Sequence, residues 1–231
     1  LNVANAVGEL AIAALCLSGL GFIARNQGDY ERAATFHEES LALQQGLGDR
    51  RAVACSQANL GSIAQNKGDI ARAEALFAEA LTTFHALGDR QLTADVSANL
   101  AILANQLGDY ARAREHAEVA LRFYREVEDR QAVATAMLAY ANADRGLGEA
   151  SRAEAAYLEA LKLFREVAHL PGISSALLHL SSVALDDKDE MRALPLLAEC
   201  LATLELTGEK PAIADALDAA ARTAAILDRW D

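Results

Sequence analysis

A spacing of 40 residues organises this chain, which is 231 residues long. Successive units carry an arginine and an alanine side by side, followed by a leucine eight residues after the alanine. These residues are Arg32, Arg72, Arg112, Arg152 and Arg192; Ala33, Ala73, Ala113, Ala153 and Ala193; and Leu41, Leu81, Leu121, Leu161 and Leu201. A fixed period of a few tens of residues is typical of repeat arrays, in which each unit contacts its neighbours only. We therefore expect one quasi-linear array and not a globular enzyme domain.

The composition of each unit predicts helices. Hydrophobic residues make up 52% of the chain and aromatic residues only 5%, and the abundant Ala and Leu are strong helix formers. Each unit holds two helical stretches that are separated by a glycine and an acidic residue, as in Gly68-Asp69. The glycine can end one helix in the left-handed conformation, and the aspartate can cap the next helix. We expect about eleven antiparallel helices, near 9–26, 30–46, 50–66, 70–86, 90–106, 110–126, 130–146, 150–167, 172–186, 190–206 and 210–229.

The register also predicts the limits of the units. They are 9–48, 49–88, 89–128, 129–168 and 169–208, with a partial unit at 209–231. Residues 1–8 are interpreted as the tail of a preceding unit, because Leu1 is in register with Leu41. The pattern weakens toward the C-terminus, where Pro195 falls inside an expected helix and should bend or fray its first turns. We interpret this segment as a drifting terminal unit; a hinge or docking element is the alternative.

Charge and cysteine content exclude several classes of function. The net charge of −12 argues against a nucleic-acid-binding surface, which needs clustered Lys and Arg, and is typical of a soluble protein. No uninterrupted run of about 18 apolar residues is seen, so we expect no membrane span. Cys16, Cys55 and Cys200 have no paired spacing, which suits small apolar fillers in a reducing compartment, and we expect a cytoplasmic protein. Without a Cys-x-x-Cys pair or a histidine cluster, we expect no metal and no cofactor.

Catalytic signatures are also missing from the sequence. The five histidines fall at different positions of their units and should not converge. No phosphate-binding glycine loop, nucleophile elbow or zinc-binding His-Glu-x-x-His helix is present. We therefore expect that the chain is not an enzyme.

Small and large residues in each unit resemble the pattern of the tetratricopeptide repeat. That pattern has Leu followed by a small residue in the first helix, as in Leu60-Gly61, and Ala early in the second helix, as at Ala73. A bulky residue and a small one follow, as Phe77 and Ala80 do here. The resemblance covers nearly the whole chain and implies an all-α, right-handed superhelix of antiparallel helices. Two features differ: the period is 40 residues instead of 34, and Gly-Asp replaces the proline after the second helix.

This longer form resembles the repeats of kinesin light chains, spindle-orienting adaptors and large bacterial signal-transduction ATPases. The ATPases include the maltose-operon activator and LuxR-type regulators. The Ala- and Arg-rich sequence of the repeats is more similar to the bacterial group. In those bacterial proteins the array is a sensor that binds an inducer or a partner protein, and the resemblance implies the same role here.

The resemblance places the first helix of each unit on a concave face. Asn59 and Asn99 are in register on this face, and Asn142 lies three residues further along it in the next unit. An amide side chain both donates and accepts hydrogen bonds, and the related families use an asparagine here to hold an extended peptide. The alternative is that these asparagines cap or bridge neighbouring helices. The candidate site comprises Asn59, Asn99, Asn142, Asn66, Arg25, Arg145, Ser62, Gln106 and His179.

We therefore expect a non-catalytic module that binds a protein, a peptide or a small polar inducer. We expect it to be the sensor region of a larger bacterial signal-transduction or transcription-regulatory protein. The alternatives are a free-standing adaptor that scaffolds a protein complex and a receptor for a small signalling peptide. We expect no direct contact with nucleic acid and none with a membrane, and the sequence makes no prediction of the oligomeric state.

Overall fold

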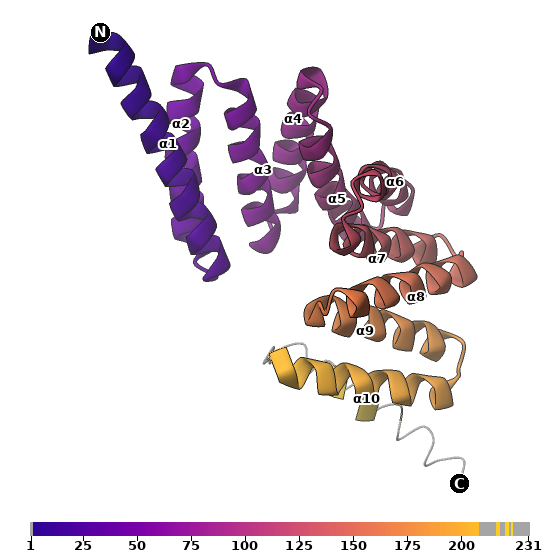
Figure 1. Ribbon diagram of the computed structural model, residues 1–231. Helices are drawn as coiled ribbons and strands as arrows, with labels where there is room; N and C mark the ends of the chain where they lie inside the picture. Colours follow the sequence, from indigo (N-terminus) through magenta and orange to yellow (C-terminus); the bar gives the residue numbers. More distant parts are fainter. Residues whose placement is uncertain (1, 208–215, 218–219, 222, 224–231) are drawn as a thin grey trace. The chain divides into compact units, whose positions relative to one another are not determined.

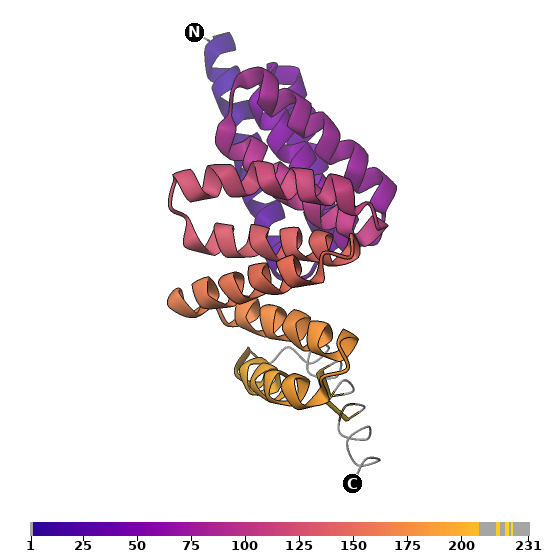
Figure 2. The same ribbon diagram turned by 90° about the vertical axis from the view of Figure 1, so that its right-hand side faces the viewer.

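The computed structural model describes residues 2–207, 216–217, 220–221 and 223. These residues form helices joined by short turns and contain no strand, which confirms the all-α repeat array (Figures 1 and 2). The expected helix 210–229 lies largely outside the described residues. The ten helices are α1 Asn2–Asn26, α2 Tyr30–Leu47, α3 Arg50–Asn66, α4 Ile70–Leu87, α5 Arg90–Leu107, α6 Tyr110–Glu126, α7 Arg130–Gly146, α8 Ala150–Glu166, α9 Leu170–Asp186 and α10 Glu190–Thr207 among the residues that the structure describes.

Most helix limits agree with the sequence to within a residue, and three expectations were wrong. Helix α1 begins at Asn2 and runs without a turn, so residues 2–8 are not separated from the first helix. Helix α9 begins at Leu170, because the Nδ1 atom of His169 accepts a hydrogen bond from the backbone of Gly172 at 3.0 Å and caps the helix. Helix α10 is not frayed by Pro195 and is continuous through it.

Glycine and aspartate punctuate the helices as the sequence predicted. Gly48 adopts φ +71° at the end of α2, and the side chain of Asp49 accepts a hydrogen bond from the backbone N–H of Ala52 at 3.0 Å. Three of the left-handed turn positions hold other residues, namely Glu128, Ala168 and Lys188, with φ of 56°, 52° and 59°. A side chain in this conformation costs about 1–2 kcal/mol relative to the right-handed one. The turns of the later units that have lost their glycine therefore carry backbone strain.

The chain divides into two compact units, Leu1–Leu103 and Ala104–Asp231, with the division inside α5. In the first unit α2 packs on α1 and α3, and α3 packs on α4. In the second unit α6 to α10 pack each on the next in chain order. The division of the whole chain into one array with the limits given above stays a prediction.

The alanine and the arginine of the repeat each have a structural role in every unit. All five repeat alanines are completely buried. In the core of the first unit, Phe77 lies so close to Gly61 that a Cβ atom on the glycine would be 2.9 Å from the ring. The repeat arginines each approach an acidic side chain, in the pairs Arg32–Asp29, Arg72–Glu38, Arg112–Asp109, Arg152–Asp144 and Arg192–Glu154.

Helix α1 differs from the other helices in its apolar surface. Its segment Val7–Asn26 has a mean hydropathy of 2.0, and only 17% of it is buried. By length and composition this segment could cross a membrane, although Glu9 and Arg25 interrupt its apolar run. The absence of a membrane contact stays a prediction. Core helices of soluble proteins and signal sequences share the same composition, and the finding alone does not place α1 in a membrane.

Candidate functional site

Two of the candidate asparagines lie at equivalent positions of the first unit. Asn59 on α3 and Asn99 on α5 are both half-buried. Neither amide side chain has a hydrogen-bond partner among the described residues. Ser62 donates its hydroxyl to the backbone oxygen of Ala58, at 3.2 Å, and Asn66 is exposed at the end of α3. The first unit therefore presents two partly buried amides whose hydrogen-bonding capacity the fold does not use.

Arg25 and Gln106 lie apart from this pair. Arg25, near the end of α1, places its guanidinium carbon 5.3 Å from the centre of the Phe22 ring. This distance is suitable for a cation–π interaction. Gln106 is exposed near the end of α5, in the part of that helix that belongs to the second unit.

The other three candidate residues meet around Tyr157 of α8 in the second unit. The hydroxyl of Tyr157 donates a hydrogen bond to Oδ1 of Asn142 on α7, at 2.5 Å. The ring of His179 on α9 stacks on the Tyr157 ring, with centroids 5.1 Å apart and planes 10° apart. Arg145 on α7 binds Oδ2 of Asp186 through Nη2 at 2.6 Å and Nε at 3.0 Å. The structure therefore brings these residues together, but in contacts within the protein.

Burial sets the protonation of this group. It lowers the pKa of His179 to about 4, with the Arg145 charge acting in the same direction, so the imidazole is neutral at pH 7. Burial also raises the pKa of Tyr157 to about 12, so the hydroxyl stays protonated and can donate. The amide oxygen of Asn142 thus accepts a hydrogen bond within the fold, and only its NH₂ group is left without a partner among the described residues. The three expected amides are therefore not chemically equivalent.

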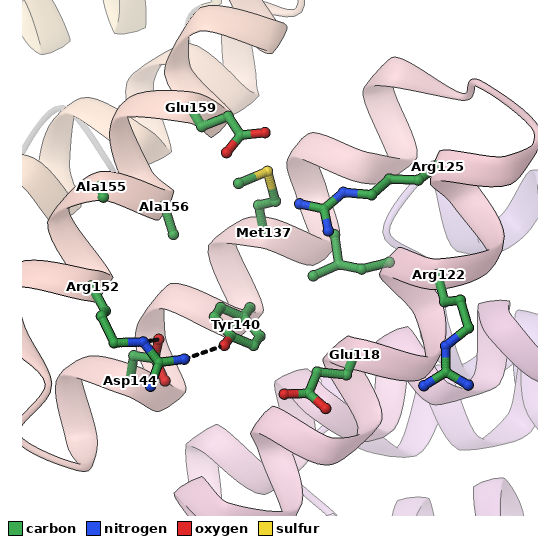
Figure 3. Close-up of a pocket in the computed structure, with 11 residues that line it drawn as sticks. Glu118, Arg122, Arg125, Met137, Tyr140, Asp144, Arg152, Ala155, Ala156 and Glu159 are labelled. Atoms are coloured by element: carbon green, nitrogen blue, oxygen red, sulfur yellow. Dashed lines mark hydrogen bonds and ion pairs between the residues drawn. The ribbon is translucent and has the colours of Figure 1, made fainter.

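A cavity of about 740 Å³ lies in the second unit between α6, α7 and α8 (Figure 3). None of the candidate residues lines it. Arg152, Asp144 and Tyr140 gather at one end, while Arg125 of α6 and Glu159 of α8 point toward the middle. The lining residues are Glu118, Leu121, Arg122, Arg125, Met137, Tyr140, Asp144, Arg152, Ala155, Ala156 and Glu159.

Asp144 is the least ordinary residue of this pocket, because its carboxylate is completely buried. It lies 3.5 Å from Nε of Arg152 and 3.6 Å from Nη1 of Arg114, close enough for ion pairs. Neither carboxylate oxygen has a hydrogen-bond partner in the described part of the chain. Arg152 also donates from Nη2 to the Tyr140 hydroxyl at 2.6 Å. The Asp144 charge raises the pKa of Arg152 and keeps its guanidinium protonated.

The sequence analysis missed this pocket because it considered only the residues that recur in every unit. The residues that indicate the pocket are those that differ from their equivalents in the other units. Asp144 stands where the other units have alanine, and Tyr140 stands where they have leucine. Ala156 stands where the other units have a larger side chain. The equivalent residues are Ala24, Ala64, Ala104 and Ala184 for the first position, Leu20, Leu60, Leu100 and Leu180 for the second, and Phe36, Leu76, His116 and Leu196 for the third.

Solved structures of the same fold include bacterial proteins. A Rap protein in complex with the Competence and Sporulation Factor superposes with a TM-score of 0.77 at 12% identity, over 92% of this chain and 63% of that one. Aspartyl phosphate phosphatase F from Bacillus subtilis superposes with a TM-score of 0.75 at 12% identity, over 93% of this chain and 56% of that one. BtubC from P. vanneervenii gives a TM-score of 0.57 at 22% identity, over 95% of this chain and 92% of that one. At these identities the likeness is one of fold, and this chain spans less than two thirds of the first two proteins.

Sequence comparison gives the family. No curated protein matches the chain. The profile of the tetratricopeptide repeat matches three overlapping stretches, residues 9–84, 52–126 and 90–166, which together cover more than half of the chain. Its alanine positions are buried and its helices are arranged as that repeat requires. The chain therefore belongs to the tetratricopeptide repeat family.

Proposed function

We propose that this chain is a non-catalytic module that binds an extended segment of a protein partner along its first helices. The observation that carries the proposal is the pair Asn59 and Asn99, which are in register and half-buried and have no hydrogen-bond partner among the described residues. A partly desolvated amide that gains a partner contributes about 1 kcal/mol, so two of them in line favour a backbone that both donates and accepts. The partner's side chains matter less to such a contact than its extended main chain.

The fold relatives support a binding role. One of them, the Rap protein, was solved in complex with the Competence and Sporulation Factor. We propose that this chain likewise binds a peptide or protein factor, although a small polar inducer would also suit the amides. The name of another relative is that of a phosphatase, but this chain spans only 56% of it.

The histidines support the non-catalytic part of the proposal. His37 is buried and His179 is stacked on Tyr157, and burial lowers the pKa of both. His169 caps a helix. These three side chains therefore serve the fold, and each belongs to a different helix or turn.

We further propose that the module is the sensor region of a larger cytoplasmic bacterial regulator. A free-standing adaptor and a receptor for a small signalling peptide are the alternatives. The reading frame that contains this chain separates them. A nucleotide-binding domain or a helix-turn-helix in the same frame supports the sensor, and a frame without either supports the adaptor or the receptor.

The binding proposal is tested with peptides selected on the purified chain from a displayed library of random sequences. The double variant Asn59→Ala with Asn99→Ala should bind the selected peptides at least about tenfold more weakly, which corresponds to about 1.4 kcal/mol. Gln91→Ala removes an exposed amide from α5 and serves as the matched control, with unchanged affinity. Equal affinity of the double variant and the wild type, at unchanged helicity, would place the peptide site elsewhere.

A further inference from the structure

Ala156 leaves room on one side of the pocket between α6, α7 and α8. At the equivalent position the other units place Phe36, Leu76, His116 and Leu196, and each of these side chains is much larger than a methyl group. The resulting cavity of about 740 Å³ is within the range of sites that hold small organic ligands, about 300–1,000 Å³. The equivalent place between α2, α3 and α4 holds a cavity of about 480 Å³ that Leu76 does not line, so the space beside Ala156 distinguishes the two cavities.

Two neighbours in the pocket orient the side chain of Arg152. Asp144 faces its Nε atom and Tyr140 accepts from its Nη2 atom, so the guanidinium plane is fixed from two directions. The side chain is still 52% exposed, which leaves N–H groups directed away from these partners and open to a ligand. A guanidinium in a fixed plane matches the two oxygens of a carboxylate better than a lysine does.

Burying Asp144 is costly, and this cost points to a role. A buried carboxylate without hydrogen bonds is unfavourable, and the other four units have alanine there. Its partners Arg114 and Arg152 are both partly exposed and would be hydrated without it. The fold thus does not need Asp144, whereas the orientation of Arg152 does.

The remaining charges limit the ligand. Arg122 and Arg125 on α6, and Glu118 on α6 with Glu159 on α8, have no ion-pair partner within the described ranges. With Asp144 and Arg152 the lining holds three acidic and three basic residues, so its formal charge is zero. For a dianion such as phosphate, the attraction by the three arginines and the repulsion by the three carboxylates both double, so the lining as a whole gives it no net electrostatic gain over a monoanion. The one guanidinium that its neighbours orient, that of Arg152, suits a single carboxylate.

We propose that this pocket binds a ligand that carries one carboxylate on a short apolar body. The carboxylate pairs with Arg152, and the body packs against Leu121, Met137 and Ala156. Asp144 and Tyr140 are positioning residues that act through Arg152. The site is separate from Asn59 and Asn99, which belong to the first unit. A peptide C-terminus and a free organic acid both present this chemistry.

The test uses N-acetyl-leucine and isocaproate, each beside its uncharged amide, titrated into the whole chain by calorimetry and by NMR. Both carboxylates should bind at millimolar concentration, and both amides at least about tenfold more weakly. Tighter binding of N-acetyl-leucine identifies a peptide C-terminus as the source, and equal or tighter binding of isocaproate identifies an organic acid. Failure of both carboxylates to bind, or equal binding of acids and amides, would overturn the proposal.

Variants locate the site. Ala156→Phe introduces the residue found at position 36, where the repeat accommodates it, and should abolish binding. Arg152→Lys keeps the charge but loses the planar fork, and should weaken the acids at least several-fold. Arg72→Lys, at the equivalent position of the first unit, is the matched control and should bind as the wild type does. Wild-type affinity in both pocket variants would refute the site.

The role of Asp144 is tested by measuring how strongly the pocket prefers the acid ligands over their amides. Asp144→Ala installs the residue of the other units, so the variant should fold with undiminished thermal stability. It should nevertheless lose most of the preference for acid over amide. Asp144→Asn keeps an oxygen acceptor and should restore part of that preference. Full discrimination in Asp144→Ala would show that Arg152 needs no positioning by this carboxylate.

Discussion

At the scale of single residues, the burial of His179 against Tyr157 makes the stability of the fold depend on pH. The neutral imidazole is stable in the fold because burial and the Arg145 charge disfavour its protonation. In the unfolded chain the same group takes up a proton near its ordinary pKa of 6.5. A folded pKa below the unfolded one means that the stabilisation is complete above pH 6.5 and is lost as the pH falls from there toward 4.

We expect acidification from pH 7 to pH 5 to lower the free energy of unfolding by about 1–2 kcal/mol through His179 alone. His179→Phe keeps a ring on Tyr157 but cannot titrate. Urea denaturation of the wild type and this variant at both pH values isolates the effect, because His37 and His116 titrate in both proteins. A difference between the two proteins that does not change with pH would contradict the lowered pKa.

At the scale of helices and turns, the left-handed residue that ends α8 gives a second prediction. Ala168 is exposed and has φ 52°, where Gly48 and Gly88 stand in earlier units. Ala168→Gly should relieve about 1–2 kcal/mol of strain and lose part of this to the entropy of the unfolded chain, for a net gain of about 0.5–1 kcal/mol. Ala71→Gly, at an exposed helical position, should instead cost about 0.5–1 kcal/mol. If Ala168→Gly lowered the melting temperature as Ala71→Gly does, the turn would not be strained.

Helices were predictable because each carries its own signals. Gly48 ends α2 and Asp49 caps the start of α3, and neither role depends on a distant residue. The start of α9 was missed because its cap is a histidine, a residue that seldom serves as one. The position of Asn142 was predictable from the repeat, but its bond to Tyr157 was not. That bond depends on side-chain directions across two helices, which a register does not specify.

The pocket was also not predictable from the repeat register. Its room and its charge depend on Ala156 and Asp144 together, and neither is unusual for a helix by itself. They are informative only against the equivalent residues of the other units. A position-by-position comparison of the units would have found them.

At the scale of the whole molecule, a repeat array takes its stability from contacts between neighbouring units. The same position can therefore be buried in one unit and open in another. Ile63 on α3 is 2% exposed, because α2 and α4 pack on that helix. Its equivalent on α1, Ile23, is 52% exposed, and the described residues place only α2 against α1 as an extensive neighbour.

This difference predicts a large contrast between two chemically identical substitutions. Ile63→Ala should cost about 2–5 kcal/mol, because it removes buried methyl groups and leaves a cavity. Ile23→Ala should change the free energy of unfolding by no more than about 0.5 kcal/mol, as exposed substitutions usually do. Urea denaturation of the two variants in parallel measures the contrast, and each variant is the other's control, since residue type, helix position and truncation are the same. A comparable loss in Ile23→Ala would mean that in solution another surface covers α1, and size measurement by light scattering would then show whether that surface belongs to a second copy of the chain.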